Sequence, residues 1–256
     1  DIFPDSSGAF VNEAYAYMNA NQPEEAIAPF EMALETGDTE PDTYRFLAGL
    51  YQTYDRVDDG IALLEDAASQ FPENADVQTE LLNAYQASGQ IDKALESYKT
   101  AVEREPDNKL FRFNYGTLLT QIEDYPAAVA QLEKAIELDP DYSNAHYNLG
   151  AAYINMAVDV NDQVRSLDEA LSAERGDLSR DQISEREATI NALVDERRAI
   201  FGSAIAPLET AKSLFESAGE DATGVCMALY QSYVQTDELD KARSVEECAG
   251  YSDTGE

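Results

Sequence analysis

Two cysteines, Cys226 and Cys248, and one histidine, His146, are the residues of this chain best suited to covalent or metal chemistry. A lone histidine cannot anchor the usual zinc patterns, which need several His or Cys ligands at fixed spacing. The chain has no Gly-Lys phosphate-binding loop, no nucleophile elbow and no Cys/His pairing for nucleophilic catalysis. Carboxylates are so abundant that paired ones carry almost no information on general acid–base catalysis. We therefore expect no enzymatic activity, no metal and no cofactor.

The charge of the chain narrows the range of its partners. Its 256 residues include 51 acidic and 17 basic ones, which gives a net charge of −34. This field repels phosphate backbones and anionic lipids, and no apolar run approaches the roughly 18 residues of a membrane-spanning helix. We expect neither nucleic-acid binding nor membrane insertion. The acidic excess, with only six lysines, is typical of a halophilic protein, because concentrated salt screens self-repulsion.

A period of 34 residues organises most of the chain. One column of residues with this period consists of Tyr17, Tyr51, Tyr85, Leu119 and Tyr153. A second consists of Ala33, Ala67, Ala101 and Ala135, a third of Ala26, Gly60, Ala94 and Ala128, and a fourth of Phe30, Leu64, Tyr98 and Leu132. Prolines close three successive units at Pro72, Pro106 and Pro140. Agreement among five columns indicates internal repeats.

The residue spacing predicts two helices in each unit. Apolar residues such as Leu47 and Tyr51 recur at helical spacing, and a polar break at 55–59 separates them from the next stripe, which contains Leu64 and Ala67. Small residues in the alanine column let paired helices approach closely, while the tyrosine column fills the space between units. The proline then ends the second helix. The sequence predicts an all-α chain of antiparallel helix pairs.

The segment FNYGTLLTQIEDYPAAVAQLEKAIELDPDY at 113–142 matches the tetratricopeptide repeat pattern almost throughout, and the chain resembles that family over most of its length. The resemblance implies a right-handed superhelical solenoid that binds proteins and does not catalyse a reaction. We place an N-terminal tail at 1–6, repeats at 7–40, 41–74, 75–108 and 109–142, a fifth repeat at 143–218, a terminal sixth at 223–249 and an acidic tail at 250–256.

An insertion at about 159–200 interrupts the fifth repeat. The second helix expected soon after Ala157 appears only at 204–212, as AIAPLETAK. The inserted residues keep a helical apolar stripe, and Ser179 with Gln182 has the spacing of a capping box. We predict a projecting helical hairpin with its tip near 175–179. Its mixed charges are typical of a solvated face; the alternative is a surface that binds a partner or a second copy of the chain.

In tetratricopeptide repeats the first helices line a concave groove that takes an extended peptide or a partner's helix. By this resemblance the groove here is rich in amides and aromatic rings, with Arg45 as its sole strong base. Amides can pair with a peptide backbone while rings cover apolar side chains. The predicted groove residues are Tyr15, Met18, Asn19, Arg45, Gln52, Asn83, Gln86, Phe113, Gln121, Tyr147 and Asn155, with Val11, Thr53, Thr79, Thr117, Ile154, Met227 and Gln231 beside them. The alternative is a merely solvated face.

The two cysteines fall on the two helices predicted for the sixth repeat, near the start of the first and the end of the second. Antiparallel packing would bring these ends together, and a disulfide there would staple a terminal pair that has no following neighbour. Two free core thiols are the alternative, because geometry and compartment decide. His146 occupies the column of Phe10 and Tyr44 and is interpreted as a packed core residue.

The sequence thus predicts a non-catalytic scaffold that binds a protein or an extended peptide through the groove. The alternative is a structural element that forms homo-oligomers through the hairpin at 159–200. The organisation also resembles envelope-associated or secreted bacterial tetratricopeptide proteins with a helical extension in the penultimate repeat. With Asp1 as the first residue, this favours an extracytoplasmic location after removal of a targeting segment, with the cytoplasm as the alternative.

Overall fold

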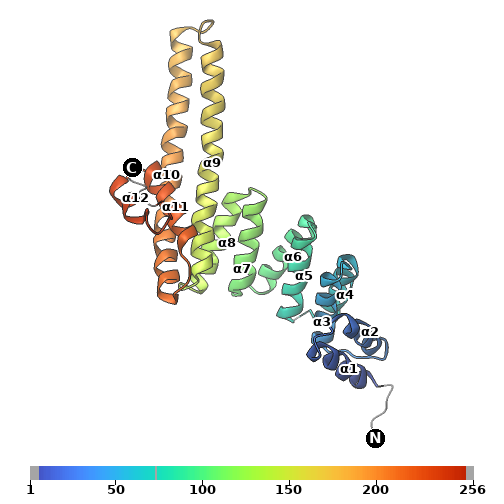
Figure 1. Ribbon diagram of the computed structural model, residues 1–256. Coiled ribbons are helices and arrows are strands. Elements are labelled where there is room, and N and C mark those ends of the chain that lie inside the picture. Colours follow the sequence, from blue (N-terminus) through green and yellow to red (C-terminus); the bar gives the residue numbers. More distant parts are fainter. Residues whose placement is uncertain (1–5, 73, 252–256) are drawn as a thin grey trace. The chain divides into compact units, whose positions relative to one another are not determined.

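The computed structural model of the chain describes residues 6–72 and 74–251 and is all-α (Figure 1). Over this part of the chain, twelve α-helices and one short 3-10 helix follow one another as pairs, which confirms the predicted fold class. The chain divides into two compact units, Asp1–Arg104 and Glu105–Glu256. Each unit has its own buried hydrophobic clusters.

The first unit contains three helix pairs, and a 3-10 turn at Glu24–Ala26 leads into its second helix. Its helices are α1 (Ser7–Asn19), α2 (Ile27–Glu35), α3 (Pro41–Thr53), α4 (Val57–Gln70), α5 (Ala75–Ala87) and α6 (Ile91–Arg104). The second unit begins with a regular pair, continues with two long helices and ends with a short pair. Its helices are α7 (Lys109–Gln121), α8 (Tyr125–Leu138), α9 (Ser143–Glu174), α10 (Arg180–Ala218), α11 (Thr223–Gln235) and α12 (Leu239–Val245).

Small residues lie where the two helices of a pair come closest. The alanines of the 34-residue column are all buried. In the second unit two glycines allow a still closer approach. A Cβ atom on Gly116 would lie 2.6 Å from Cγ of Leu132, and one on Gly150 would lie 2.4 Å from Cγ of Leu208. Both distances are well below the roughly 3.5–4.0 Å of carbon–carbon contact, so the packing at these positions requires glycine.

A residue in the left-handed region forms the turn inside most pairs. These residues are Asn21, Asp55, Gly89 and Glu123, again 34 positions apart, and Asp237 in the last pair. Asparagine, aspartate and glycine tolerate this conformation better than most residues. The next position of the series is Ala157, which is fully buried inside α9. The absence of a turn residue there accounts locally for the continuation of α9 as a helix.

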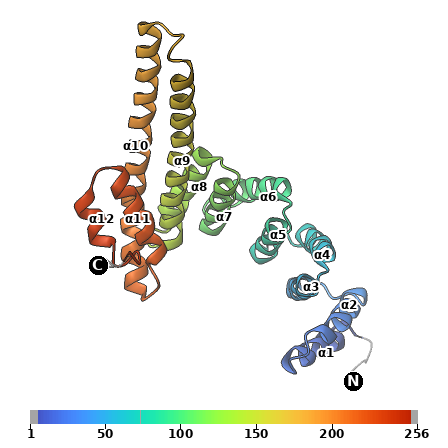
Figure 2. The same ribbon diagram turned by 45° about the horizontal axis from the view of Figure 1, so that its top comes forward.

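The two long helices α9 and α10 form the predicted hairpin, and they lie side by side in Figures 1 and 2. Their junction at 175–179 confirms the predicted tip. Ser179 and Gln182 form the predicted capping box, in which each side chain bonds the other's backbone N–H. Two ion pairs join the arms near the tip, Arg175 with Glu187 at 3.1 Å and Arg186 with Glu174 at 2.9 Å.

Neither these long helices nor the shorter ones, within the described residues, combine the length and apolar character needed to span a membrane.

The tyrosine column ties successive helix pairs together through its hydroxyl groups. The O–H of Tyr51 donates to Glu31 at 2.6 Å, and that of Tyr85 donates to Glu65 at 2.7 Å. In each case the glutamate lies on the second helix of the preceding pair, 20 residues earlier. A cation completes the contact, since Lys93 binds Glu65 at 2.9 Å and lies over the Tyr85 ring. The second unit repeats this pattern in α10 and α11.

These contacts predict a loss of stability in alkali. Burial, and then the hydrogen bond to Glu31, raises the pKa of Tyr51 to about 12 from its usual 10. Burial first, and then the bond to Glu65, also raises the pKa of Tyr85. The unfolded chain therefore loses these protons at lower pH than the folded chain does. The stabilisation from each tyrosine is complete below pH 10 and is lost as pH rises towards the folded pKa.

We expect Tyr51 alone to account for about 1 kcal/mol of lost stability by pH 11 relative to pH 8. Urea unfolding at several pH values measures this loss. In Tyr51→Phe the free energy of unfolding should depend less steeply on pH between 9 and 11, because the titrating group is gone. If the free energy of unfolding falls equally steeply with pH in wild type and in Tyr51→Phe, titration of Tyr51 does not contribute to the loss of stability.

Candidate functional site

A cleft with a volume of about 560 Å³ opens between α9 and α11 in the second unit. The long helix α9 forms one wall, α11 forms the other, and Tyr251, which follows the last helix, closes part of the rim. We call this the α9–α11 cleft. Its lining residues are Tyr147, Ala151, Ile154, Asn155, Gly224, Met227, Ala228, Tyr230, Gln231, Val234, Gln235 and Tyr251.

Helix α11 has one face towards the core and one towards the cleft. The core face carries Cys226, Leu229 and Tyr233, all at most 4% exposed. On the cleft side, Met227 is 45% exposed and Val234 is 37% exposed. Large apolar side chains on a surface helix normally face inward. The outward position of these two makes the α9–α11 cleft a candidate contact surface.

Tyrosines line both walls of the cleft. Tyr147 of α9 passes so close to α11 that a Cβ atom on Gly224 would lie 3.4 Å from its hydroxyl oxygen. At the other wall the rings of Tyr230 and Tyr251 are 4.8 Å apart. Gly250, with φ of +75°, turns the chain back so that the N–H of Tyr251 donates to the carbonyl of Glu246. This turn places an aromatic side chain from outside the helices at the cleft.

A disulfide joins α11 to the segment that follows α12. The structure bonds Cys226 to Cys248, with their Cα atoms 5.7 Å apart, and both residues belong to or pack against the same buried cluster. Of the two alternatives that the sequence left open, the structure therefore contains the disulfide. Cys248 lies three residues before Tyr251, so the crosslink anchors the segment that carries this tyrosine to the helix that forms the cleft wall.

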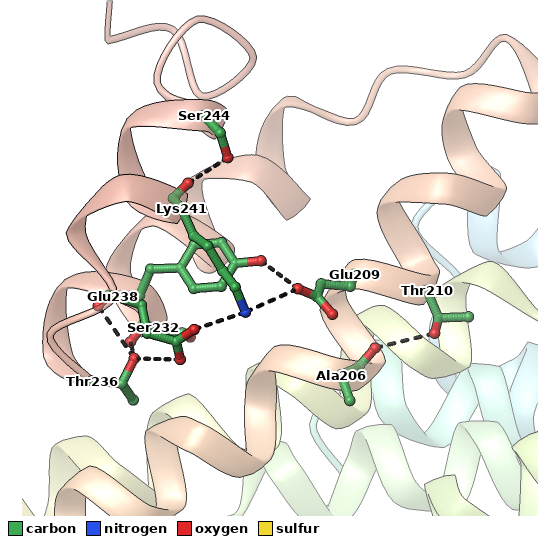
Figure 3. A network of polar contacts seen from close by, with 9 residues as sticks. Ala206, Glu209, Thr210, Ser232, Thr236, Glu238, Lys241 and Ser244 are labelled. Carbon is green, nitrogen blue, oxygen red and sulfur yellow. Dashed lines mark hydrogen bonds and ion pairs between the residues drawn. The ribbon is translucent and has the colours of Figure 1, made fainter.

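Polar contacts hold α10, α11 and α12 together behind the cleft (Figure 3). Tyr233 donates its O–H to Glu209 of α10 at 2.7 Å, which repeats the tyrosine–glutamate contact of the first unit. Lys241 of α12 lies 2.8 Å from Glu238 and 3.9 Å from Glu209. The bond with Glu238 raises the pKa of Lys241, and the bond with Lys241 lowers the pKa of Glu238. Both groups are therefore charged at neutral pH. Lys241 joins α12 to α10, and the bond of Tyr233 joins α11 to α10.

The walls of the cleft carry no charge, although the surrounding unit is strongly charged. Residues 142–158 and 222–236 contain no Asp, Glu, Lys or Arg, whereas the second unit as a whole has 30 acidic and 12 basic residues. The polar groups of the lining are instead phenols and amides. The described residues also hold no group of three or more His, Cys, Asp and Glu side chains placed to bind a metal. Such a lining can bury apolar groups and exchange neutral hydrogen bonds.

The structure brings together only part of the predicted groove. Five of its residues line the α9–α11 cleft: Tyr147, Ile154, Asn155, Met227 and Gln231. Phe113 and Gln121 do not line it, and Phe113 packs against the ring of Tyr142 at 4.9 Å. Sequence reasoning missed Tyr230, Val234, Gln235 and Tyr251. The first three could have been found from the helical spacing after Met227, but nothing in the repeat pattern signals Tyr251.

The predicted groove residues of the first unit lie on α1, α3 and α5. Tyr15 packs edge-on against Phe30 at 5.7 Å, and Met18 joins the same cluster. Arg45 lies near Asp42 at 3.0 Å, Asp76 at 3.4 Å and Glu80 at 3.6 Å. These carboxylates neutralise the one base predicted to be available to a partner. Of the amides, Asn19 and Asn83 are exposed, and Gln52 and Gln86 are half-buried.

His146 is a packed residue, as predicted. It is 8% exposed, and its Nε2 lies 2.8 Å from the carbonyl oxygen of Pro140. Because a carbonyl only accepts hydrogen bonds, Nε2 carries the proton in this contact. The histidine links the start of α9 to the preceding loop and does not line the α9–α11 cleft.

Comparisons with known proteins agree with the repeat architecture. A model described as tetratricopeptide repeat matches residues 53–122, and one described as TPR repeat matches residues 116–156. No curated protein matches the chain.

Among solved structures, PilF of Pseudomonas aeruginosa is 15% identical, with a TM-score of 0.59 over 98% of this chain and 93% of that one. A MamA protein is 14% identical, with a TM-score of 0.55 over 82% of this chain and 96% of that one. MamA from Desulfovibrio magneticus RS-1 is 14% identical, with a TM-score of 0.51 over 75% of this chain and 97% of that one. At these identities the likeness concerns the fold alone. The repeat columns, the helix pairs and the two matched repeat models together show that the chain contains tetratricopeptide repeats, matched over residues 53–156.

Proposed function

We propose that the chain is a non-catalytic interaction module that binds a segment of a partner protein in the α9–α11 cleft. Tetratricopeptide repeats mediate protein–protein interactions, and proteins built from them are typically not enzymes. The observation that carries the proposal is the pair of exposed apolar side chains, Met227 and Val234, inside an uncharged concave surface of a highly charged chain. Exposed apolar side chains gathered in a concave, uncharged surface are typical of interaction sites in soluble proteins.

The geometry of the cleft suits recognition of a chain segment. Its rings offer flat apolar contact area, and its amides offer both donors and acceptors. The walls come from helices held by the disulfide and by the contacts around Glu209, so they are in place before a partner arrives. A preorganised site spends less binding free energy on ordering its own groups.

The hairpin is the alternative interaction surface, and it has weaker support. Within residues 159–200, Leu167 is the one large apolar side chain that is strongly exposed, at 41%. Several arginines of the hairpin are already engaged: Arg175 and Arg186 with acids of the opposite arm, Arg165 with Asp162, and Arg197 with Asn161. A surface of internally paired charges resembles a solvated face, so the proposal favours the cleft over self-association through the hairpin.

A charge placed in the cleft tests the proposal. In Met227→Glu a carboxylate replaces an exposed apolar side chain of the lining, and we expect at least a tenfold loss of binding because the partner's apolar groups would meet an unpaired charge. The measurement is quantitative pull-down from a lysate of the source organism, with captured proteins compared between wild type and variant.

The matched control is Leu239→Glu, which places the same charge at another exposed apolar side chain, 52% accessible, on α12 outside the cleft. It should leave capture unchanged. If Met227→Glu keeps its helical circular dichroism and still captures every wild-type partner, the cleft is not the binding surface.

A further inference from the structure

The chemistry of the cleft and of its surroundings indicates what kind of segment it takes. This inference rests on the proposed function, and it adds the chemical class and conformation of the ligand. Three features carry it: unpaired amides in the lining, the absence of charge from both walls, and the aspartates that bound each uncharged stretch.

The amides favour an extended ligand backbone. The side chains of Asn155, Gln231 and Gln235 make no hydrogen bond to any residue in the part of the chain that the structure describes. Each can donate and accept at once. A helix satisfies its own backbone groups, whereas an extended peptide has free N–H and C=O groups along its length. Three unpaired amides in one cleft therefore match an extended segment better than a helix.

The neutral walls require a neutral, apolar centre in the ligand. Met227, Val234 and the tyrosine rings can cover aliphatic or aromatic side chains. A charged side chain at this point would be partly desolvated without a counter-charge, which is unfavourable. From Gly224 to Gln235 the wall formed by α11 measures roughly 17 Å at 1.5 Å per residue. At about 3.3 Å per residue, five extended residues span this length.

Aspartates mark the ends of the neutral stretches. Asp141 and Asp159 bound the uncharged part of α9, and Asp221 and Asp237 bound that of α11. Asp159 lies one helical turn beyond Asn155, and its side chain is exposed. Asp237 is already paired with Arg198 at 2.9 Å. Beyond Asp141, Asp159 and Asp221, a ligand longer than the cleft passes from a neutral surface to a negative one. Lys or Arg at those positions would meet opposite charge.

We propose that the α9–α11 cleft binds an extended peptide segment with about five uncharged, apolar central residues and with Lys or Arg on its flanks. The centre of this ligand contributes through burial, which salt does not weaken. The flanks contribute through exposed charges, which salt screens.

Selection from a random library of twelve-residue peptides displayed on phage tests the proposal. The full chain is the target, and clones that also bind Met227→Glu are removed. We expect the surviving peptides to have apolar centres and more Lys and Arg at the flanks than the unselected library. Synthetic versions should bind wild type at least tenfold more tightly than Met227→Glu. Val234→Glu serves as the second variant if Met227→Glu does not fold.

A charge reversal outside the cleft tests the flanks separately. Asp159→Lys should weaken a selected peptide several-fold at 50 mM salt, and the difference should disappear at 1 M salt. Cleft-dependent peptides with neutral or acidic flanks, or with charged centres, would overturn the ligand class and leave the proposed function intact. Failure to recover any peptide that depends on Met227 or Val234 would overturn the proposed function itself.

Discussion

Replacing Gly150 by valine should lower the free energy of unfolding by about 3 kcal/mol, because overpacking of a tight helix contact typically costs about 1–3 kcal/mol and this site has no room to relax. A Cβ atom at this position would lie 2.4 Å from Cγ and 2.5 Å from Cδ2 of Leu208. Leu208 is fully buried, so it cannot swing into solvent. Helices α9 and α10 would have to separate beneath the α9–α11 cleft. Chemical unfolding followed by circular dichroism measures the effect.

Gly202→Val is the matched control, since Gly202 lies on α10 and a Cβ atom there would meet only Thr236, at 4.0 Å. Valine and glycine differ little in helix propensity, so this variant should be close to neutral.

A second substitution, at Leu208, tests the same contact from the other side. Leu208→Ala alone should cost about 2–5 kcal/mol through the cavity that it leaves. In the double variant Gly150→Val/Leu208→Ala the smaller alanine at position 208 would relieve the clash, so the double variant should be more stable than the sum of the two single effects predicts. Equal stability of Gly150→Val and Gly202→Val would disprove the close contact.

Removal of the disulfide should destabilise the terminal helix pair by about 3 kcal/mol, the value expected for a closed loop of this size. Cys226 and Cys248 are 22 residues apart, and α12, with seven residues, is too short to be stable without its contacts. The expected result of reduction is local opening of the segment after α11, because repeat arrays lose structure pair by pair from their ends. Trypsin should then cleave at Lys241 and Arg243, and Tyr251 should lose its contact with Tyr230.

Limited proteolysis with mass spectrometry measures this opening, with and without reductant. The double variant Cys226→Ala/Cys248→Ala is the control, because it should be cleaved equally under both conditions. A mass increase of about 2 Da on reduction identifies the bonded form. Two free thiols in protein purified without reductant would contradict the crosslink. Identical cleavage rates in the oxidised and reduced chain would contradict the predicted opening of the terminal pair.

The fold was accessible from sequence because a helix pair is a local structure repeated at a fixed period. The alanine column, the tyrosine column and the capping box at Ser179 each act over a few residues or across one neighbouring pair. The hairpin could be predicted for the same reason, since its arms continue an unbroken helical stripe. The turn position supplied a further signal that was not used: Asn21, Asp55, Gly89 and Glu123 lead to an alanine at 157.

The tyrosine–glutamate contacts were missed although their signal is present in the sequence. Glu31, Glu65 and Glu133 share the 34-residue period, and the remaining position of that column is Lys99. The tyrosine column has one exception, Leu119, and it lies 20 residues after Lys99. Because leucine has no hydroxyl group, it forms no hydrogen bond that would require a glutamate at position 99. The two columns thus change together within one chain. Comparing the tyrosine column with the glutamate column 20 residues earlier would have predicted the hydrogen bonds between successive helix pairs.

The candidate site was predictable only in part, because a repeat pattern assigns a residue to a face but not to a cavity. Met227 and Gln231 were placed on the correct face of α11 by their column. Their neighbours across the cleft, such as Tyr147 and Asn155, are about 75 residues away, beyond an insertion that has no counterpart in other repeats. Tyr251 belongs to no helix, so no periodic signal could assign it to the wall.

By itself the sequence determined the helix pairs, their 34-residue period, the hairpin and the acidic character of the chain, since each follows from local spacing or composition. Tertiary structure decided which predicted groove residues share one cleft, that Arg45 is already paired with carboxylates, and that the two cysteines are joined. The cleft and the disulfide depend on how α9, α10, α11 and α12 pack against one another, and the pairing of Arg45 depends on how α3 lies against α5. Contacts between side chains distant in sequence determine how helices pack. In this unit they include the close contact of Gly150 with Leu208 and the disulfide between Cys226 and Cys248.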